Sequence, residues 1–236
     1  MSVTRLVLPG VAIAPGTIRV PAEAAQHAKV ARVGSGEPVE VLDLAGAVGI
    51  GTLARWDGKA CVVEVERVER ERGEPPAPLV LGLAALHTQA FDWAVEKATE
   101  LGATAVVPVL AARVQGGRHA ARVERWRRVA DSAVAQCGRS RAPRVGEPAS
   151  LADFLAASRG TRLLADTDAS MPSAFDAGGG GITLLVGPEG GLTDEERSAV
   201  LAAGFAGLPL GPRTLRAETA AVTGLALAQM LAGWTG

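Results

Sequence analysis

The chain has 236 residues, of which 48% are hydrophobic and 21% charged, and its formal net charge is −1. This composition is typical of a globular protein, and the near-zero charge excludes a strong attraction of the whole protein to nucleic acid. Two cysteines and three histidines without ligand spacing predict neither a disulfide framework nor a metal site. No stretch reaches the ~20 apolar residues of a membrane span and no signal peptide is recognisable, so we expect a cytoplasmic location.

The first 68 residues alternate short β-favouring segments with turn signals. Asp57-Gly58 lies between two such segments and predicts a β-hairpin. One helix is expected from Pro21 to about residue 33, since proline is tolerated in a first helical turn. The predicted strands are residues 5–8, 17–20, 38–44, 48–53 and 59–68. Many short strands in so few residues predict a small β-barrel.

Residues 66–78 read ERVERERGEPPAP, and here the character of the chain changes. A run of charges followed by three prolines predicts a semi-rigid linker. Domain boundaries fall in such segments. We therefore predict two domains, which comprise residues 1–72 and residues 77–236.

From residue 79 onward, apolar strands alternate with segments of helical periodicity. The predicted strands are residues 79–86, 104–110, 161–165, 182–186 and 205–210. The predicted helices are residues 91–101, 120–138, 153–157, 194–204 and 217–231. Thr193 and Glu196 form a capping-box pattern before the fourth of these helices. The alternation predicts an α/β domain with a parallel sheet and helices on both of its faces.

Arginines are concentrated in one stretch, residues 113–144, which we call the arginine stripe. It contains nine arginines and only two acids, Glu124 and Asp131. A solvated helix face and a footprint for a phosphate backbone are both consistent with this pattern.

Two glycine-bearing loops each follow an apolar strand and precede a helix. The first contains GPEGG (residues 187–191) and the second contains LGPRTLRAE (residues 210–218). The chain has no GxGxxG and no Walker-type pattern, so the usual dinucleotide and triphosphate cradles are absent. Each loop alone also fits an ordinary strand-to-helix turn, but such loops meet where an α/β sheet binds its ligand. We interpret the pair as a nucleoside-type cofactor site beside Arg216 and Glu218.

The same segments resemble a known family. LLVGPEGGLTDEE (residues 184–196) and LPLGPRTLRAETAAV (residues 208–222) resemble the signature segments of the bacterial 16S rRNA uracil-N3 methyltransferases, which belong to the SPOUT class. Supporting matches are HAKVARVGSGEPVEVLDLAG (27–46), WAVEKATELGA (93–103) and RWRRVADSAVAQCGR (125–139). The resemblance covers nearly the whole chain in order.

This resemblance implies a fold, a reaction and partners. The fold is a small N-terminal PUA-like β-barrel that binds RNA, followed by a C-terminal SPOUT α/β domain with a parallel sheet and a trefoil knot. The reaction is S-adenosylmethionine-dependent methylation of N3 of the uridine conventionally numbered 1498, in the 16S rRNA of the small ribosomal subunit. The family is further implied to act as an obligate homodimer.

The resemblance also assigns site residues. Arg216 and Glu218 are expected to be catalytic and to face the reacting uracil. Our hypothesis from the chemistry is that Arg216 donates to the developing uracil oxyanion, and that Glu218 orients it or helps to remove the N3 proton. Arg32, Arg113 and Arg139 are expected to contact RNA. The residues expected to bind S-adenosylmethionine are Leu185, Val186, Gly187, Pro188, Glu189, Gly190, Gly191, Leu210, Gly211 and Leu215. No metal is expected.

Three other functions stay open at this point. One is a SPOUT enzyme that methylates a ribose 2′-hydroxyl. Another is a non-catalytic RNA-binding or assembly protein, against which the retained Arg216 and Glu218 argue. The third is a nucleotide-binding α/β domain that does not act on RNA, against which the arginine stripe argues.

Overall fold

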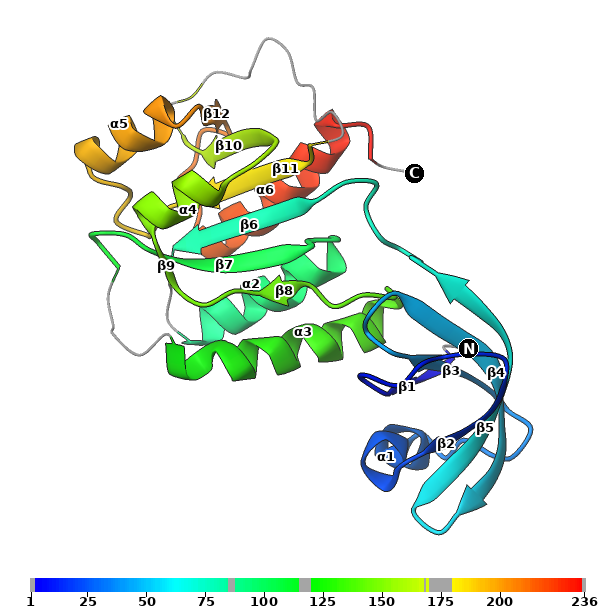
Figure 1. Cartoon of the computed structure of the whole chain (residues 1–236). Helices are drawn as coiled ribbons and strands as arrows, with labels where there is room; N and C mark the ends of the chain where they lie inside the picture. The colour runs from blue at the N-terminus through cyan, green and yellow to red at the C-terminus, as the bar shows by residue number, and fades with distance from the viewer. Residues whose placement is uncertain (1–2, 85–87, 115–119, 168, 170–179, 235–236) are drawn as a thin grey trace. The chain divides into compact units, whose positions relative to one another are not determined.

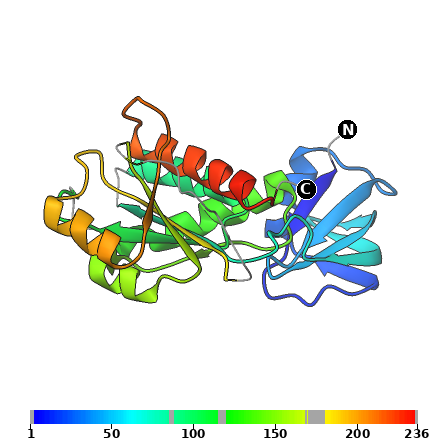
Figure 2. The ribbon, with the colours of Figure 1, turned by 90° about the horizontal axis from the view of Figure 1, so that it is seen from above.

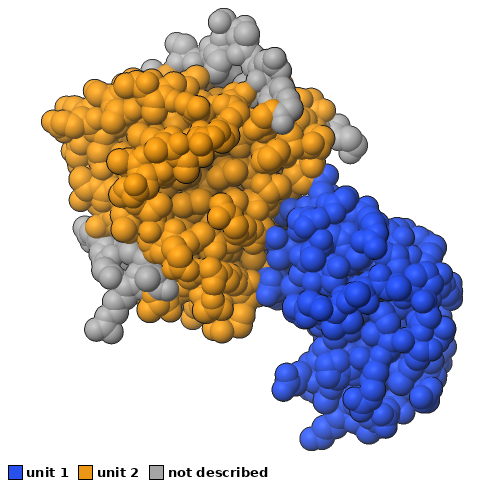
Figure 3. All heavy atoms as spheres, in the orientation of Figure 1, with its two compact units in different colours: residues 1–74, 131–142 blue, residues 75–130, 143–236 orange. Residues whose placement is uncertain are grey.

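The computed structural model describes residues 3–84, 88–114, 120–167, 169 and 180–234. The chain forms two compact units, coloured separately in Figure 3. Unit 1 comprises Met1–Glu74 and Asp131–Ala142, and unit 2 comprises Pro75–Ala130 and Pro143–Gly236. The sequence did not predict that a later segment, residues 131–142, groups with the N-terminal unit.

Unit 1 contains a five-stranded sheet in the order β1-β3-β4-β5-β2 (Figure 1). β1 pairs in parallel with β3, and the other pairs are antiparallel. The strands are β1 (Thr4–Val7), β2 (Gly16–Val20), β3 (Pro38–Leu42), β4 (Ala47–Asp57) and β5 (Ala60–Arg70). Helix α1 (Ala22–Val30) packs Ala25 and Ala28 into an aliphatic core with these strands. The predicted strands, the helix and the hairpin after Asp57 are confirmed.

The prediction of a linker over residues 66–78 is wrong for its charged half. β5 continues to Arg70. Beyond it, Arg72 donates to Glu40 at 2.7 Å, and Glu74 accepts from Arg139 at 2.6 Å. These charged side chains are therefore bound rather than solvated. The composition alone does not show this, because each partner comes from a distant part of the chain.

The last part of helix α3 (Val123–Cys137) completes unit 1. Val134 packs against β3 and β4. The Arg5 guanidinium donates to the carbonyl oxygens of Ala135 and Gln136, at 3.0 and 2.7 Å. A cation at these carbonyls stabilises the negative end of the helix dipole. Unit 1 thus consists of two chain segments, joined by aliphatic packing and by hydrogen bonds to charged groups.

Unit 2 is built on a parallel sheet in the order β12-β10-β11-β6-β7-β8, with β9 also paired to β7 (Figure 1). The strands are β6 (Leu79–Ala84), β7 (Ala105–Leu110), β8 (Arg144–Val145), β9 (Ala149–Ser150), β10 (Thr161–Ala165), β11 (Ile182–Val186) and β12 (Ala206–Leu208). Every pairing is parallel, which confirms the predicted α/β architecture. β8 and β9 were not predicted, and residues 85–86 of the first predicted strand lie outside the described residues.

Helices cover both faces of this sheet (Figure 2). On one face lie α2 (Thr88–Glu100), α6 (Ala217–Leu231) and the first half of α3, which follows the short 3-10 turn η1 (Ala120–Arg122). On the other lie α4 (Leu151–Ala157) and α5 (Asp194–Ala202). In β11, Leu184 and Val186 face the first layer and Leu185 faces the second. Successive strand residues point to opposite faces, so a strand covered on both sides is apolar throughout.

The predicted capping box is confirmed at the start of α5. The Thr193 hydroxyl accepts from the Glu196 N–H at 3.2 Å, and the Glu196 carboxylate accepts from the Thr193 N–H at 2.9 Å. Two reciprocal hydrogen bonds therefore stabilise the first turn of α5, which follows the first glycine loop. Within the described residues, none of the helices has both the length and the hydropathy needed to cross a bilayer.

Candidate functional site

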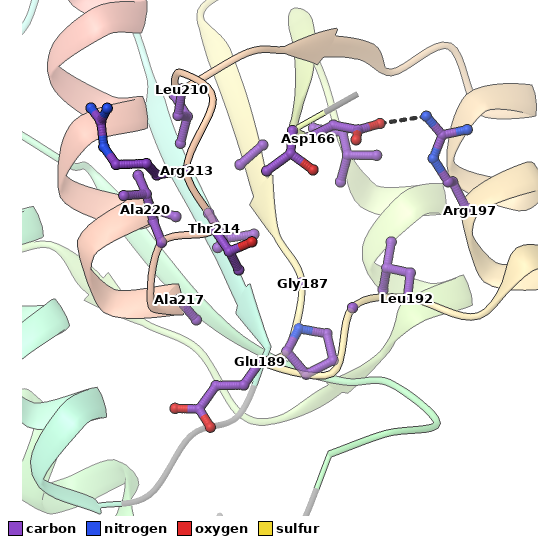
Figure 4. Close-up of a pocket in the computed structure, with 17 residues that line it drawn as sticks. Asp166, Gly187, Glu189, Leu192, Arg197, Leu210, Arg213, Thr214, Ala217 and Ala220 are labelled. Carbon is purple, nitrogen blue, oxygen red and sulfur yellow. Dashed lines mark hydrogen bonds and ion pairs between the residues drawn. The ribbon is translucent and has the colours of Figure 1, made fainter. Parts of the chain in front are cut away.

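A cavity of about 280 Å³ opens at the carboxyl ends of β10, β11 and β12 (Figure 4). Ligands of α/β sheets bind at this edge, where the loops leave the strands. Three loops and the start of α6 enclose the cavity. The lining residues are Leu164, Ala165, Asp166, Thr167, Val186, Gly187, Pro188, Glu189, Gly191, Leu192, Arg197, Leu210, Arg213, Thr214, Leu215, Ala217 and Ala220.

The walls of this pocket combine aliphatic and charged groups. Val186 ends β11, and Ala217 and Ala220 present one face of α6. Figure 4 shows side chains with charged ends around these walls, among them Glu189 and Arg213. Such a pocket accepts a ligand whose ring system meets aliphatic side chains and whose polar groups meet the rim.

The first glycine loop makes a tight turn after β11. The Gly191 N–H donates to the Pro188 carbonyl at 2.8 Å. Gly191 has a φ of 70°, which side-chain-bearing residues rarely adopt. The loop leads directly into Thr193 and the capped end of α5, so its backbone is fixed at both ends.

The second glycine loop runs from β12 to α6. Gly211 has a φ of 102° and open space where a Cβ would lie, so the backbone conformation rather than crowding requires glycine. Leu210 and Leu215, on either side of it, are half-buried and line the pocket. Arg213 and Thr214 also line it and are exposed. These last two residues lie within the second loop that the sequence predicts to wrap the cofactor.

A third loop, after β10, was not predicted as part of the site. Asp166, 11% exposed, accepts from Arg197 of α5 at 2.5 Å, as Figure 4 shows. Both residues line the pocket. The available signal was the position of Asp166 directly after a predicted strand. Its relevance depends on β10 lying between β11 and β12, and this order is not readable from the sequence.

The predicted cofactor-binding residues divide into two groups. Seven line the pocket: Val186, Gly187, Pro188, Glu189, Gly191, Leu210 and Leu215. Three do not: Leu185, Gly190 and Gly211. Leu185 points to the opposite face of the sheet and packs into the core with Phe154 and Val200. Because strand side chains alternate between faces, the expected contact of Leu185 with the cofactor stays a prediction for its backbone alone.

The predicted catalytic residues flank the pocket wall without lining it. Arg216 is the exposed N-cap residue of α6, and its side chain makes no capping hydrogen bond. Glu218 lies in the first turn of α6 and is half-buried. Its Oε2 is buried and lacks a hydrogen-bond partner in the part of the chain that the structure describes. Ala217, between the two, faces the pocket.

The three predicted RNA contacts have different surroundings. Arg32 is exposed after α1, with a φ of 58°. Arg113 is exposed, and its guanidinium donates to the Gly190 carbonyl at 2.6 Å. Arg139 is only 4% exposed and is paired with Glu74. The prediction that Arg139 contacts RNA does not fit this burial, because its charge is already met inside unit 1.

The arginine stripe is less positive than its sequence indicates. Four of its members have carboxylate partners: Arg125 with Asp92, Arg127 with Glu124 and Glu147, Arg139 with Glu74, and Arg141 with Glu71. Within the described residues, Arg128 and Arg144 form no ion pair, and both are exposed. The positive potential of the stripe therefore comes from a subset of its arginines.

The start of α5, beside the pocket, favours negative charge. A backbone N–H hydrogen bond at Glu195, then one from the Thr193 hydroxyl and the nearby Arg113, hold the pKa of the Glu195 carboxyl below its ordinary value.

Among the described residues, no three or more His, Cys, Asp or Glu side chains gather in a way that suits a metal ion.

Comparison with known proteins places this architecture in a family. A family model described as an RNA methyltransferase domain matches residues 73–229. The chain is 34% identical over 219 residues to ribosomal RNA small subunit methyltransferase E of Mycobacterium bovis, covering 84% of this chain and 80% of that protein. It is 32% identical over 206 residues to the protein of the same name from Synechocystis sp., covering 84% and 67%.

A solved structure resembles the whole chain. The crystal structure of a ribosomal RNA small subunit methyltransferase E from Neisseria gonorrhoeae, bound to S-adenosyl methionine, superposes with a TM-score of 0.89 at 28% identity and covers 98% of each chain. With its parallel sheet and its pocket at the strand ends, the chain belongs to the RNA methyltransferase family that includes the ribosomal RNA small subunit methyltransferase E proteins.

Proposed function

We propose that this protein transfers a methyl group from S-adenosylmethionine to N3 of the uridine conventionally numbered 1498 in 16S rRNA. One observation carries the proposal: in a chain of this family, the residues of both signature loops enclose a pocket at the carboxyl ends of β10, β11 and β12. The pocket also has Arg216 at its edge, at the N-cap of α6.

The residues of the pocket fit this cofactor. Leu164, Val186 and Leu210 offer aliphatic surfaces to an adenine ring. The methionyl end of the cofactor carries an ammonium and a carboxylate, and the rim has both acids and arginines. The cofactor has no phosphate, which agrees with the absence of a phosphate-binding loop. A cavity of about 280 Å³ is near the lower end for small-molecule sites.

When bound, S-adenosylmethionine supplies an electrophilic methyl group on a sulfonium sulfur. Arg216 then stabilises the uracil as N3 loses its proton, by donating to a carbonyl oxygen that gains negative charge. For an N3 pKa about two units above neutral, deprotonation at pH 7 costs roughly 3 kcal/mol. One well-placed donor contributes ~10²–10³ in rate, which is enough to offset this cost.

Glu218 supplies an acceptor for that proton. An unpartnered buried oxygen such as its Oε2 costs about 1–3 kcal/mol, and a proton or a hydrogen bond from the uracil removes this cost. Glu218 lies in the first turn of α6, directly after Arg216 and Ala217. In this proposal Arg216 and Glu218 act on the uracil, and the glycine loops hold the methyl donor.

Mapping the modified nucleotide tests the proposal. We expect N3-methyluridine at one position of 16S rRNA in cells that contain the protein, and uridine there in cells that lack it. Nucleoside mass spectrometry of purified small subunits and of naked 16S rRNA, each incubated with the protein and S-adenosylmethionine, identifies the substrate. A methyl on a ribose 2′-hydroxyl would support the alternative SPOUT reaction. Failure to bind the cofactor in calorimetry would support a non-catalytic RNA-binding protein.

We also propose the architecture that the resemblance implies. Unit 1 would be a PUA-like barrel that binds RNA through Arg32, which is exposed and in the left-handed region. The knot proposal is supported by the path of the chain. β12 lies at the edge of the sheet beyond β10, and the chain then returns as α6 to pack on β11 and β6. The protein would act in the cytoplasm on the small subunit.

A homodimer is the proposed assembly. Trp93 of α2 and Met230 of α6 are 41% and 59% exposed, and these two helices pack against each other. Exposed apolar side chains on a helical face suit association with a second copy. Sedimentation velocity tests this proposal: we expect a dimer, and we expect Trp93→Lys to shift it towards monomer. A wild-type monomer at micromolar concentration would contradict the proposal.

A further inference from the structure

The loop after β7 is attached to the first glycine loop and to α5. The Ala112 N–H donates to Glu196 Oε1 at 2.7 Å, and Arg113 Nη1 donates to the Gly190 carbonyl at 2.6 Å. Glu196 Oε2 simultaneously completes the capping box at Thr193. The same short segment, residues 112–113, therefore holds both the C-terminal part of the first glycine loop and the first turn of α5.

Gly190 faces this segment rather than the pocket. Gly187, Pro188, Glu189 and Gly191 all line the cavity, but Gly190 does not. A Cβ added at Gly190 would lie 3.4 Å from Arg113 Cδ, so the arginine stem runs directly over this residue. The loop thus has one side towards the pocket and an opposite side against Arg113.

Arg113 has further donors. A guanidinium carries five N–H groups in a planar fork, and Gly190 receives one of them. The side chain is exposed, and Arg113 forms no ion pair within the described ranges. A phosphate is the ligand that best matches such a fork, because it accepts two parallel hydrogen bonds.

We propose that Arg113 is a positioning residue that holds the cofactor loop through Gly190 and couples cofactor binding to the binding of an RNA phosphate. This inference rests on the proposed function, since it takes S-adenosylmethionine as the ligand of the pocket. It assigns Arg113 a role beyond contact with RNA: the guanidinium joins the RNA to the pocket loop.

The coupling is expected to be positive. An exposed arginine loses side-chain freedom when it is held against Gly190. When a phosphate already orders the same guanidinium, this loss of conformational entropy does not occur again on cofactor binding. The loop is then better ordered for the cofactor. By linkage, the cofactor strengthens phosphate binding by the same factor.

Calorimetry without RNA tests the positioning role. For Arg113→Ala we expect an S-adenosylmethionine Kd about fivefold higher than in the wild type, as for loss of one charged hydrogen bond to an exposed loop. Arg113→Lys retains a donor for Gly190 and should stay within about twofold of the wild type. Arg159→Ala is the matched control, with an unchanged Kd, because Arg159 is an exposed arginine that donates to backbone carbonyls and does not line the pocket.

A second measurement tests the coupling. The Kd of S-adenosylhomocysteine, which cannot donate a methyl group, is measured with and without unmethylated small subunits. We expect tighter binding with subunits for the wild type and Arg159→Ala, and no tightening for Arg113→Ala. In steady-state assays, Arg113→Ala should raise the KM for both S-adenosylmethionine and the small subunit. Loss of a contact with RNA alone would raise only the KM for the small subunit.

The outcomes separate this inference from the proposed function. If the wild type binds no S-adenosylmethionine, the proposed function fails. If the wild type binds it and Arg113→Ala binds it equally well, the positioning role is overturned. If Arg113→Ala binds weakly and Arg113→Lys does not restore binding, the single hydrogen bond to Gly190 is not the cause. Tightening by subunits that persists in Arg113→Ala would overturn the coupling.

Discussion

The protein holds its arginines in two kinds of surroundings. In unit 1, the side chains of Arg5, Arg72 and Arg139 are 21%, 26% and 4% exposed, and each meets a carboxylate. Around the pocket of unit 2, Arg213 and Arg216 are exposed, and neither forms an ion pair within the described part of the chain. A guanidinium whose partner belongs to the fold stabilises the fold, whereas one whose donors face solvent beside a pocket is available to a ligand.

The burial of charge gives this comparison its energetic meaning. An arginine or a carboxylate taken out of water must be paired, or the folded state loses several kcal/mol. Glu74 meets this requirement fully, since it accepts from Arg139, from both the N–H and the hydroxyl of Ser140, and from the Arg141 N–H. Substitutions in the two regions should therefore affect different properties.

The largest expected effect is on catalysis. Arg216→Ala should lower the rate of methyl transfer to small subunits by about 10²–10³-fold, because it removes the donor to the uracil oxyanion. The free energy of unfolding should change by less than ~0.5 kcal/mol, since Arg216 is exposed and makes no capping hydrogen bond. Single-turnover assays and urea unfolding measure the two quantities. Near-wild-type turnover would contradict the catalytic assignment.

The next effect is on stability. Glu74→Gln removes the carboxylate charge that pairs with the buried Arg139 guanidinium and should lower the free energy of unfolding by about 3 kcal/mol. Glu124→Gln is the matched control, because it breaks the exposed pair with Arg127 and should cost no more than ~0.5 kcal/mol. Urea denaturation followed by circular dichroism compares them. Equal losses for both variants would remove the distinction between the two kinds of arginine site.

A smaller effect should appear in acid. The hydrogen bond from Arg72 holds the pKa of Glu40 below its ordinary value; burial opposes this shift, and Arg5 adds to it. A carboxyl with a lowered folded-state pKa contributes stability above its unfolded pKa of ~4.3, and this contribution is lost as the pH falls through the folded value. The free energy of unfolding should therefore decrease below about pH 4.3. Glu40→Gln should be less stable at pH 7 and show a shallower decrease, and parallel curves would contradict this.

The smallest expected effect concerns Arg197, which belongs to both classes. It is paired with Asp166, and it also lines the pocket. Arg197→Ala should raise the S-adenosylmethionine Kd by about three- to tenfold, because Asp166 loses its hydrogen bond from Arg197. Calorimetry measures the change, and thermal unfolding without cofactor serves as the control. An unchanged Kd would mean that the pair only stabilises the rim.

The parts of the fold set by local signals were predictable from the sequence. The capping box at Thr193 and Glu196 needs only neighbours three residues apart, and it forms as expected. The five apolar segments of unit 2 appear as parallel strands for the same reason, and in β11 every residue is buried, as expected for a strand covered on both faces. Most of the predicted cofactor residues line the pocket because their loops follow directly from these strands.

The rest depends on contacts that sequence order hides. Asp166 and Arg197 meet on one side of the pocket because β10 lies between β11 and β12. The Glu74 side chain, in the predicted linker, is buried because a segment far along the chain supplies Arg139. Because side chains alternate along a strand, the sequence could place Leu185 and Val186 on opposite faces of the sheet. It could not show which of these faces borders the pocket.

The two-segment construction of unit 1 has a consequence for how the protein is made. Glu74 and Arg139 are 65 residues apart in the chain. At a synthesis rate of ~5–20 residues per second, Glu74 leaves the ribosome about 3–13 s before its partner. During that interval the nascent N-terminal unit lacks the helix end that Arg5 caps and the counter-charge of Glu74. The N-terminal 74 residues are therefore not a transplantable module, and a functional graft of unit 1 requires residues 131–142 as well.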